Sequence, residues 1–214
     1  MKGPDVRVLH IDASTRVSGS ASRRLSAHFV RELAGNGLEL AVDRLDLAVS
    51  PPRHFGAAQT AATYLPIDEH TAEMAAALAA SDALCDRVLA ADAIVCGVPI
   101  YNFGMPSAFK AFIDHIARRG RTFDYTDRGL VGRLAGKKAA FLIASGGDYR
   151  PGAMFHGMDG LTPHLTAIFA FLGLTDPDII HAQPMQFDGP AAKEKALTEA
   201  EAAATALART WATP

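Results

Sequence analysis

Short apolar runs alternate along this chain with longer segments whose hydrophobic residues recur every three or four positions. The short runs have the length of buried strands, and the longer segments are typical of amphipathic helices. This alternation predicts parallel strands joined by crossover helices. The predicted strands are residues 6–11, 38–45, 93–98, 138–144 and 177–181. The predicted helices are residues 21–34, 68–90, 106–118, 161–172 and 190–211.

Local signals refine these boundaries. Ser20 is the predicted N-cap of the first helix. Residues 50–66 contain three prolines and a glycine and are predicted to form a loop. The pattern leaves open a break in the second helix near Ser81 and Asp82. With no internal repeat or linker, we expect one domain over residues 1–214, an open, doubly wound α/β sheet whose ligands bind beyond the carboxyl ends of the strands.

Charge and hydropathy limit the choice of partners. The 214 residues include 21 Lys and Arg against 23 Asp and Glu, a balance that gives no electrostatic basis for binding nucleic acid or an anionic membrane. The most apolar stretch, residues 93–109, is interrupted by prolines, glycines and Asn102, so no membrane span is expected. Charged residues divide the first 16 positions, so a secretory signal is not expected either. We expect a soluble, cytoplasmic protein.

The cysteines and histidines show no metal-binding pattern. Cys85 and Cys96 have neither CxxC nor zinc-ligand spacing, and the eight histidines form no H-E-x-x-H motif. No metal site is therefore expected.

The loop after the first predicted strand, residues 14–23, combines hydroxyls, a glycine and arginines ahead of a helix N-terminus. Such a place suits a phosphate, which backbone N–H groups, the helix dipole and Arg16 or Arg23 can stabilise. The alternative is a capped helix behind a polar surface loop. GxGxxG and Walker motifs are absent, so a single phosphate fits better than a dinucleotide or a nucleoside triphosphate.

Two further loops follow predicted strands. Residues 98–106 place aromatic side chains and Asn102 between prolines, a mixture that suits a flat heteroaromatic ring. An ordinary connection whose aromatics cover the core is the alternative. Gly146 and Gly147 leave the backbone open to a ligand edge, although adjacent glycines also make simple tight turns.

Together these loops resemble those of the FMN-dependent NADH azoreductases, flavodoxin-like enzymes that reduce quinones and azo dyes. The specific parts are the P-x-Y-N-F loop at residues 99–103, residues 106–114 behind it, and the T-F-x-Y-T…G-K-K stretch within residues 119–138. The resemblance runs from about residue 6 to residue 173. It implies a flavodoxin-like, five-stranded parallel sheet in three αβα layers. It also implies bound FMN, NADH as donor, quinone or azo acceptors, and a homodimer with its sites near the subunit boundary.

Carried over by position, the resemblance assigns roles to individual residues. It implies that the FMN phosphate is bound by Ser14, Ser20, Ala21 and Ser22. It implies that the isoalloxazine ring is contacted by Ile100, Tyr101, Asn102 and Phe103, and the pyrimidine edge of the ring by Ser145, Gly146 and Gly147. Tyr125 and Phe171 match positions on the substrate side. The family commonly has an arginine after the serine of the last motif, where this chain has Gly146, and Asp148 follows the two glycines.

We expect reduction in two half-reactions within one cleft, because donor and acceptor must each approach the same part of the flavin. The flavin carries the electrons, so no catalytic side chain is assigned. A flavin-binding electron carrier that serves a protein partner is the alternative. A hydrolase of the acyl-carrier-protein phosphodiesterase type is a further one, but the G-x-S-x-G elbow is absent. Residues 119–136 are too long for a plain connection and are expected to be functional or part of an interface.

Overall fold

The central sheet contains five parallel strands. The computed structural model describes residues 5–127 and 129–213; residues 1–4, 128 and 214 lie outside the described part. The order of the strands is β2-β1-β3-β6-β7, which confirms the predicted flavodoxin-like sheet. Their bounds are Val6–Asp12 (β1), Leu40–Asp46 (β2), Ala93–Pro99 (β3), Lys138–Ala144 (β6) and Asp178–Ala182 (β7).

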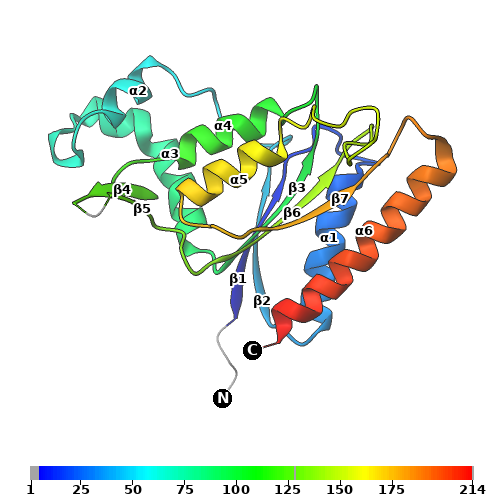
Figure 1. Ribbon diagram of the computed structural model, residues 1–214. Helices are drawn as coiled ribbons and strands as arrows, with labels where there is room; N and C mark the ends of the chain where they lie inside the picture. The colour runs from blue at the N-terminus through cyan, green and yellow to red at the C-terminus, as the bar shows by residue number, and fades with distance from the viewer. Residues whose placement is uncertain (1–4, 128, 214) are drawn as a thin grey trace.

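Helices cover both faces of this sheet and complete three layers (Figure 1). Helices α1 and α6 lie side by side on one face, and α3, α4 and α5 lie on the other. Their bounds are Ala21–Gly35 (α1), Ala72–Ala90 (α3), Ser107–Ile116 (α4), Thr162–Phe171 (α5) and Gly189–Ala212 (α6).

Strand β3 shows why the central strands appear in the sequence as unbroken apolar runs. All seven of its residues are buried. Ile94 and Cys96 pack into the core beneath α3, α4 and α5, whereas Ala93 and Val95 pack into the core beneath α1 and α6. Because both faces of the strand are covered, neither set of alternating positions can be polar.

Two of the expected boundaries were wrong. Residues 50–66 were expected to form a loop, but they include helix α2, Ala57–Thr63. This stretch is rich in alanine and contains no proline. The side chain of Gln59 caps its first turn by accepting a hydrogen bond from the Gly56 N–H. The predicted start of the second helix is a 3-10 turn, Ile67–Glu69, and α3 begins after its N-cap Thr71.

No break divides α3 at Ser81. The hydroxyl of Ser81 is buried and donates to the carbonyl oxygen of His115 at 2.6 Å, so this polar residue joins α3 to α4. A tertiary contact thus accounts for a serine that, in sequence, looks like a weak point in a helix.

A hairpin occupies the long segment between α4 and β6. Strands β4, Phe123–Thr126, and β5, Gly129–Gly132, pair antiparallel at the end of the molecule that also carries α2 and α3 (Figure 1). The hairpin lies within residues 119–136, the segment that the sequence shows to be too long for a plain connection.

Both cysteines are free and buried. Burial raises the pKa of the Cys85 thiol to about 11, and it raises the pKa of Cys96 as well. Across residues 5–127 and 129–213, no three His, Cys, Asp or Glu side chains are grouped to hold a metal ion. Within the same ranges, no helix has both the length and the apolar character needed to cross a bilayer.

Candidate functional site

The loops that follow β1, β3, β6 and β7 open at the same edge of the sheet, because all four strands are parallel. Two adjoining cavities lie there, and they share Ile100, Tyr101, Gly146 and Gln186. The first, here called the serine cavity, has a volume of about 180 Å³ and is lined by Ser14, Arg16, Ser20, Ala21, Ser22, Pro99, Ile100, Tyr101, Ala144, Ser145, Gly146, Met185 and Gln186. The second, the aromatic cavity, has a volume of about 490 Å³ and is lined by Ile100, Tyr101, Asn102, Phe103, Gly146, Gly147, Tyr149, Phe155, Gln186 and Phe187.

The structure brings together all the residues that the family resemblance assigned to a cofactor. Three separate loops contribute them, and each residue lines at least one cavity. Those in the serine cavity are Ser14, Ser20, Ala21, Ser22, Ile100, Tyr101, Ser145 and Gly146. Asn102, Phe103 and Gly147 line the aromatic cavity, which also includes Ile100, Tyr101 and Gly146.

The first turn of α1 forms the base of the serine cavity. Ser20 is the N-cap, and its hydroxyl accepts from the Arg23 N–H at 3.4 Å and lies 3.3 Å from the Ser22 hydroxyl. This turn lies directly on β3 because Gly97 has no side chain: a Cβ there would be 2.7 Å from the Ser22 carbonyl oxygen. The close approach places hydroxyls and a helix N-terminus, with its unpaired N–H groups, at the end of the sheet.

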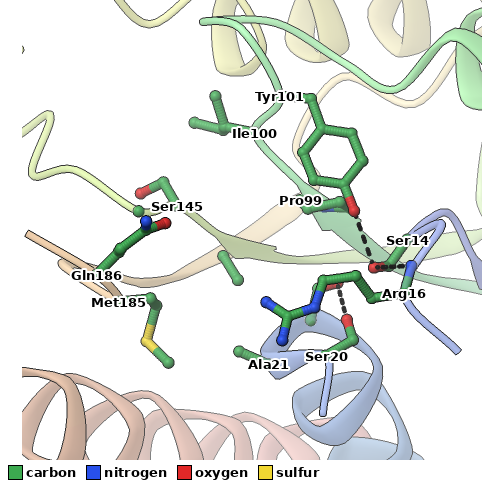
Figure 2. Close-up of a pocket in the computed structure, with 13 residues that line it drawn as sticks. Ser14, Arg16, Ser20, Ala21, Pro99, Ile100, Tyr101, Ser145, Met185 and Gln186 are labelled. Atoms are coloured by element: carbon green, nitrogen blue, oxygen red, sulfur yellow. Dashed lines mark hydrogen bonds between the residues drawn. The ribbon is translucent and has the colours of Figure 1, made fainter. Parts of the chain in front are cut away.

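The two arginines of this loop have different surroundings. Arg23 donates to both carboxylate oxygens of Asp46 at 2.6 Å and to the carbonyl oxygen of Ser14 at 2.7 Å. The guanidinium hydrogen bond lowers the pKa of Asp46 to about 2. Arg23 therefore holds the loop in place, whereas Arg16 lines the serine cavity. Figure 2 shows Arg16 beside Ser14 and Ser20, across the cavity from Gln186.

A buried polar network lies behind this loop. Asp12 accepts from the Ser26 hydroxyl at 3.2 Å and from the Arg44 guanidinium at 2.9 Å, and His10 lies 3.0 Å from the same hydroxyl. Burial lowers the pKa of His10. Serine, histidine and aspartate also form hydrolase triads, but these three are almost completely inaccessible to a substrate.

Ser145 does not favour a hydrolase either. Its hydroxyl donates to the carbonyl oxygen of Gly147 at 2.9 Å and to the side-chain oxygen of Gln183 at 3.3 Å. Neither acceptor is a general base that could activate the hydroxyl as a nucleophile.

A tight turn shapes the loop after β3. Tyr101 and Gly104 exchange two backbone hydrogen bonds, and the residues between them, Asn102 and Phe103, have φ angles of 48° and 67°. Two successive non-glycine residues in the left-handed region are strained, and such strain is concentrated at functional sites. The turn leaves Phe103 43% exposed at the aromatic cavity.

Phe155 forms the opposite wall of the aromatic cavity. The centroid of its ring lies 6.1 Å from that of Phe103, 5.8 Å from that of Tyr149 and 5.6 Å from that of Phe187. Gly147 makes room for it, because a Cβ at this position would be 2.3 Å from the Phe155 ring. The cavity therefore has flat apolar walls.

Sequence reasoning missed several lining residues. Met185, Gln186 and Phe187 follow β7, and the rule that ligands bind beyond strand ends would have found them had it been applied to the fifth strand. The same rule does not identify Phe155, because this residue lies well beyond the end of β6 and tertiary packing places its ring at the cavity.

Tyr125 and Phe171 lie outside both cavities of their own chain. Both pack against Phe123: its ring centroid is 5.8 Å from that of Tyr125 and 4.6 Å from that of Phe171. Tyr125 is 59% exposed, with the Arg119 guanidinium 5.9 Å from the centre of its ring. The structure thus brings the two predicted substrate residues to one cluster, separate from the cofactor residues, and their role stays a prediction.

Comparisons with known proteins agree with this arrangement. A family model described as a flavodoxin-like fold matches residues 6–208. The FMN-dependent NADH:quinone oxidoreductase of Nostoc punctiforme is 41% identical over 96% of this chain and 100% of its own length. The FMN-dependent NADH:quinone oxidoreductase 2 of Trichormus variabilis is 40% identical over 95% of this chain and 99% of its own length.

Solved structures give the same result. An azoreductase from Bacillus anthracis superposes with a TM-score of 0.87 at 26% identity, covering 96% of this chain and 99% of the other. An FMN-dependent NADH-azoreductase from Bacillus anthracis, in complex with FMN, superposes with a TM-score of 0.81 at 26% identity over 95% and 99% of the two chains. The chain therefore belongs to the flavodoxin-like family that includes the FMN-dependent NADH:quinone oxidoreductases.

Proposed function

We propose that this protein is an FMN-dependent oxidoreductase that transfers electrons from NADH to quinones and aromatic azo compounds. The observation that carries the proposal is the pair of joined cavities at the strand ends. One is small, rich in hydroxyls and built on a helix N-terminus, and the other is larger and has aromatic walls. The names of the relatives and of the solved structures support the same activity.

The serine cavity fits the phosphate of FMN. The hydroxyls of Ser20 and Ser22 donate to phosphate oxygens, together with backbone N–H groups of the first turn of α1. Arg16 provides a positive charge at the same place. Arg23 positions the loop through the Ser14 carbonyl rather than contacting the phosphate.

The aromatic cavity fits the ring of FMN and a flat substrate. Its volume of about 490 Å³ lies within the usual range of small-molecule sites. Tyr101, Phe103 and Phe155 provide flat surfaces that orient aromatic ligands and exclude water. When bound here, FMN would supply the hydride and electron transfer between NADH and the acceptor. The donor and the acceptor use one cavity in turn, which gives ping-pong kinetics.

A homodimer completes this proposal. Tyr125 lies outside the cavities of its own chain, on an exposed hairpin with Leu130 and Val131, which are 42% and 44% exposed. We assign Tyr125 and Phe171 to the substrate side of a site shared between two subunits. A cytoplasmic location suits the proposed donor, because cells regenerate NADH there.

The absorption spectrum of the purified protein tests the function. We expect a flavin spectrum that is bleached by NADH under anaerobic conditions and restored by a quinone or an azo dye. A flavin that is reduced only by a protein reductase would instead indicate an electron carrier. A protein that binds no flavin when FMN is added would contradict the proposal.

A further inference from the structure

Gln186 lies where the two cavities join. It lines both of them, as does Gly146 on the facing loop. Figure 2 shows its amide beside Ser145, on the opposite side of the serine cavity from Tyr101 and Ser14. A ligand that extends from one cavity into the other passes this side chain.

Backbone hydrogen bonds fix the position of Gln186. The N–H groups of Met185 and Gln186 donate to the carbonyl oxygens of Ser145 and Gly146 at 2.9 Å and 3.0 Å, so the loops after β6 and β7 are joined. The Gln186 side chain is exposed, and within residues 5–127 and 129–213 its amide forms no hydrogen bond with another residue. The backbone of Gln186 is therefore held at the junction, and the N–H and C=O groups of its side chain are available to a ligand.

Gly146 leaves the space that this side chain occupies. A Cβ at position 146 would lie 3.4 Å from both Cβ and Oε1 of Gln186 and 3.4 Å from the Phe187 ring. A methyl group makes ordinary contacts at that distance, but a longer side chain would have to displace the amide or the ring. The residues at positions 146 and 186 thus determine together which group faces the ligand.

The aromatic side of the junction differs in charge from the serine side. Every residue that lines the aromatic cavity, among those that the structure describes, has an uncharged side chain. Two carboxylates directly follow lining residues in the chain. Asp148 forms an ion pair with Arg150, whose guanidinium lowers the pKa of the carboxyl group, and Asp188 follows Phe187. The charged lining residue Arg16 belongs to the serine cavity.

We propose that Gln186 is a positioning residue that hydrogen-bonds the polar edge of the bound flavin and keeps this edge free of a cation. The inference rests on the proposed function, because it requires FMN at this site. Reduction adds negative charge to the ring, which a nearby cation stabilises and a neutral amide stabilises less. Gln186 therefore holds the flavin while keeping its reduced form a strong electron donor.

Two substitutions separate these roles. Gln186→Leu removes the hydrogen bonds and should weaken FMN binding about threefold to tenfold. Gln186→Lys introduces a cation and should shift the equilibrium between oxidised and reduced flavin at least about tenfold toward the reduced form, a rise of about 30 mV for a two-electron couple. FMN affinity is measured by fluorescence quenching on addition of apoprotein, and the midpoint potential by titration against reference dyes.

A matched control and the wild-type protein separate a failure of this inference from a failure of the proposed function. Gln59→Leu makes the same chemical change in α2, away from both cavities, and should alter neither quantity. Because the Gln186 side chain is exposed, melting temperatures of the apoproteins should stay unchanged. If wild type binds FMN but both Gln186 variants match it in affinity and potential, the inference is overturned while the proposed function stands. If wild type binds no FMN, the proposed function fails.

Discussion

At the scale of single residues, the shape of the aromatic cavity depends on a glycine. Gly147 has no Cβ, and the Phe155 ring occupies the place where one would lie. The ring packs in turn against Phe103, Tyr149 and Phe187, so one small residue determines the position of a whole aromatic wall.

Gly147→Ala tests this dependence. The new methyl group must displace the Phe155 ring and thereby remove an aromatic surface from the cavity. Losing such a contact costs about 0.5–1.5 kcal/mol, so kcat/KM for a flat quinone should fall about two- to tenfold. Steady-state kinetics with saturating NADH measures the effect.

Gly35→Ala is the matched control, because nothing lies within 4 Å of a Cβ at the end of α1. Its kinetics should equal those of wild type. Wild-type kinetics in Gly147→Ala would show that Phe155 does not form part of the substrate wall.

Asp46 makes stability depend on pH. Its pKa in the folded protein is about 2, below its ordinary value of 3.8, because Arg23 donates to its carboxylate. A lowered pKa stabilises the fold above about pH 4, and this stabilisation, of about 1–2 kcal/mol, is lost as the pH falls toward 2. Buried His10, whose pKa is also lowered, should begin to destabilise the protein already below its ordinary value of 6.5, because the unfolded chain takes up the proton first.

Urea unfolding of wild type and Asp46→Asn at a series of pH values checks the direction of this pH dependence. The free energy of unfolding of wild type should exceed that of the variant at pH 7, and the gap should narrow between pH 4 and 2. A constant gap over that interval would contradict a role for the Asp46 charge.

At the scale of elements, the first turn of α1 serves both the fold and the site. Gly97 lets it lie on β3, Arg23 fixes the loop before it, and Ser20 caps it. These structural contacts leave the hydroxyls of Ser20 and Ser22 at the serine cavity. The same residues that end the loop therefore face the proposed phosphate.

The double substitution Ser20→Ala and Ser22→Ala should weaken FMN binding by roughly 2–4 kcal/mol, because two hydrogen bonds to a charged group are lost. Loss of the N-cap should also lower the free energy of unfolding by about 1 kcal/mol. Equilibrium dialysis and urea unfolding measure the two effects separately.

Ser18→Ala changes an exposed serine of the same loop that lines neither cavity, so it should leave FMN affinity unchanged. Equal FMN affinity in wild type and the double variant would remove the α1 turn from the proposed phosphate site.

The predictability of the elements follows from their burial. Strands covered on both faces appear as apolar runs, so the sheet could be predicted from the sequence. Helix α2 was missed because prolines surround a short alanine-rich stretch that has no apolar periodicity. Three loops of the site were predicted because they follow strands directly. Phe155 could not be predicted, because tertiary contacts with other aromatic rings place it at the cavity.

At the scale of the whole molecule, the hairpin and the cavities are separate parts of one chain. Tyr125 is exposed on the hairpin, and in the proposed homodimer its position relative to a substrate depends on the second copy of the chain. A match to a family position can identify such a residue, but within one chain Tyr125 does not line the cavities proposed to hold the cofactor.

Tyr125→Ala should therefore lower kcat/KM for quinones or azo dyes about two- to tenfold while FMN content and melting temperature stay unchanged. Tyr125→Phe should keep most of the activity, because stacking needs no hydroxyl group. Specific activity of wild type should also fall when the protein is diluted below its dimer dissociation constant, as followed by light scattering and assay together.

A fully active monomer would refute the shared site. Loss of FMN or a large drop in melting temperature in Tyr125→Ala would show that the residue stabilises the hairpin instead.

The burial of Cys85 and Cys96 bears on the chemical survival of such an enzyme. Quinones are electrophiles that arylate cysteine thiolates by conjugate addition. Both thiols of this chain are shielded from solvent, and their raised pKa values keep them protonated near neutral pH. The folded protein thus offers no accessible cysteine thiolate within the part of the chain that the structure describes, so the quinones of the proposed reaction should not inactivate it through cysteine.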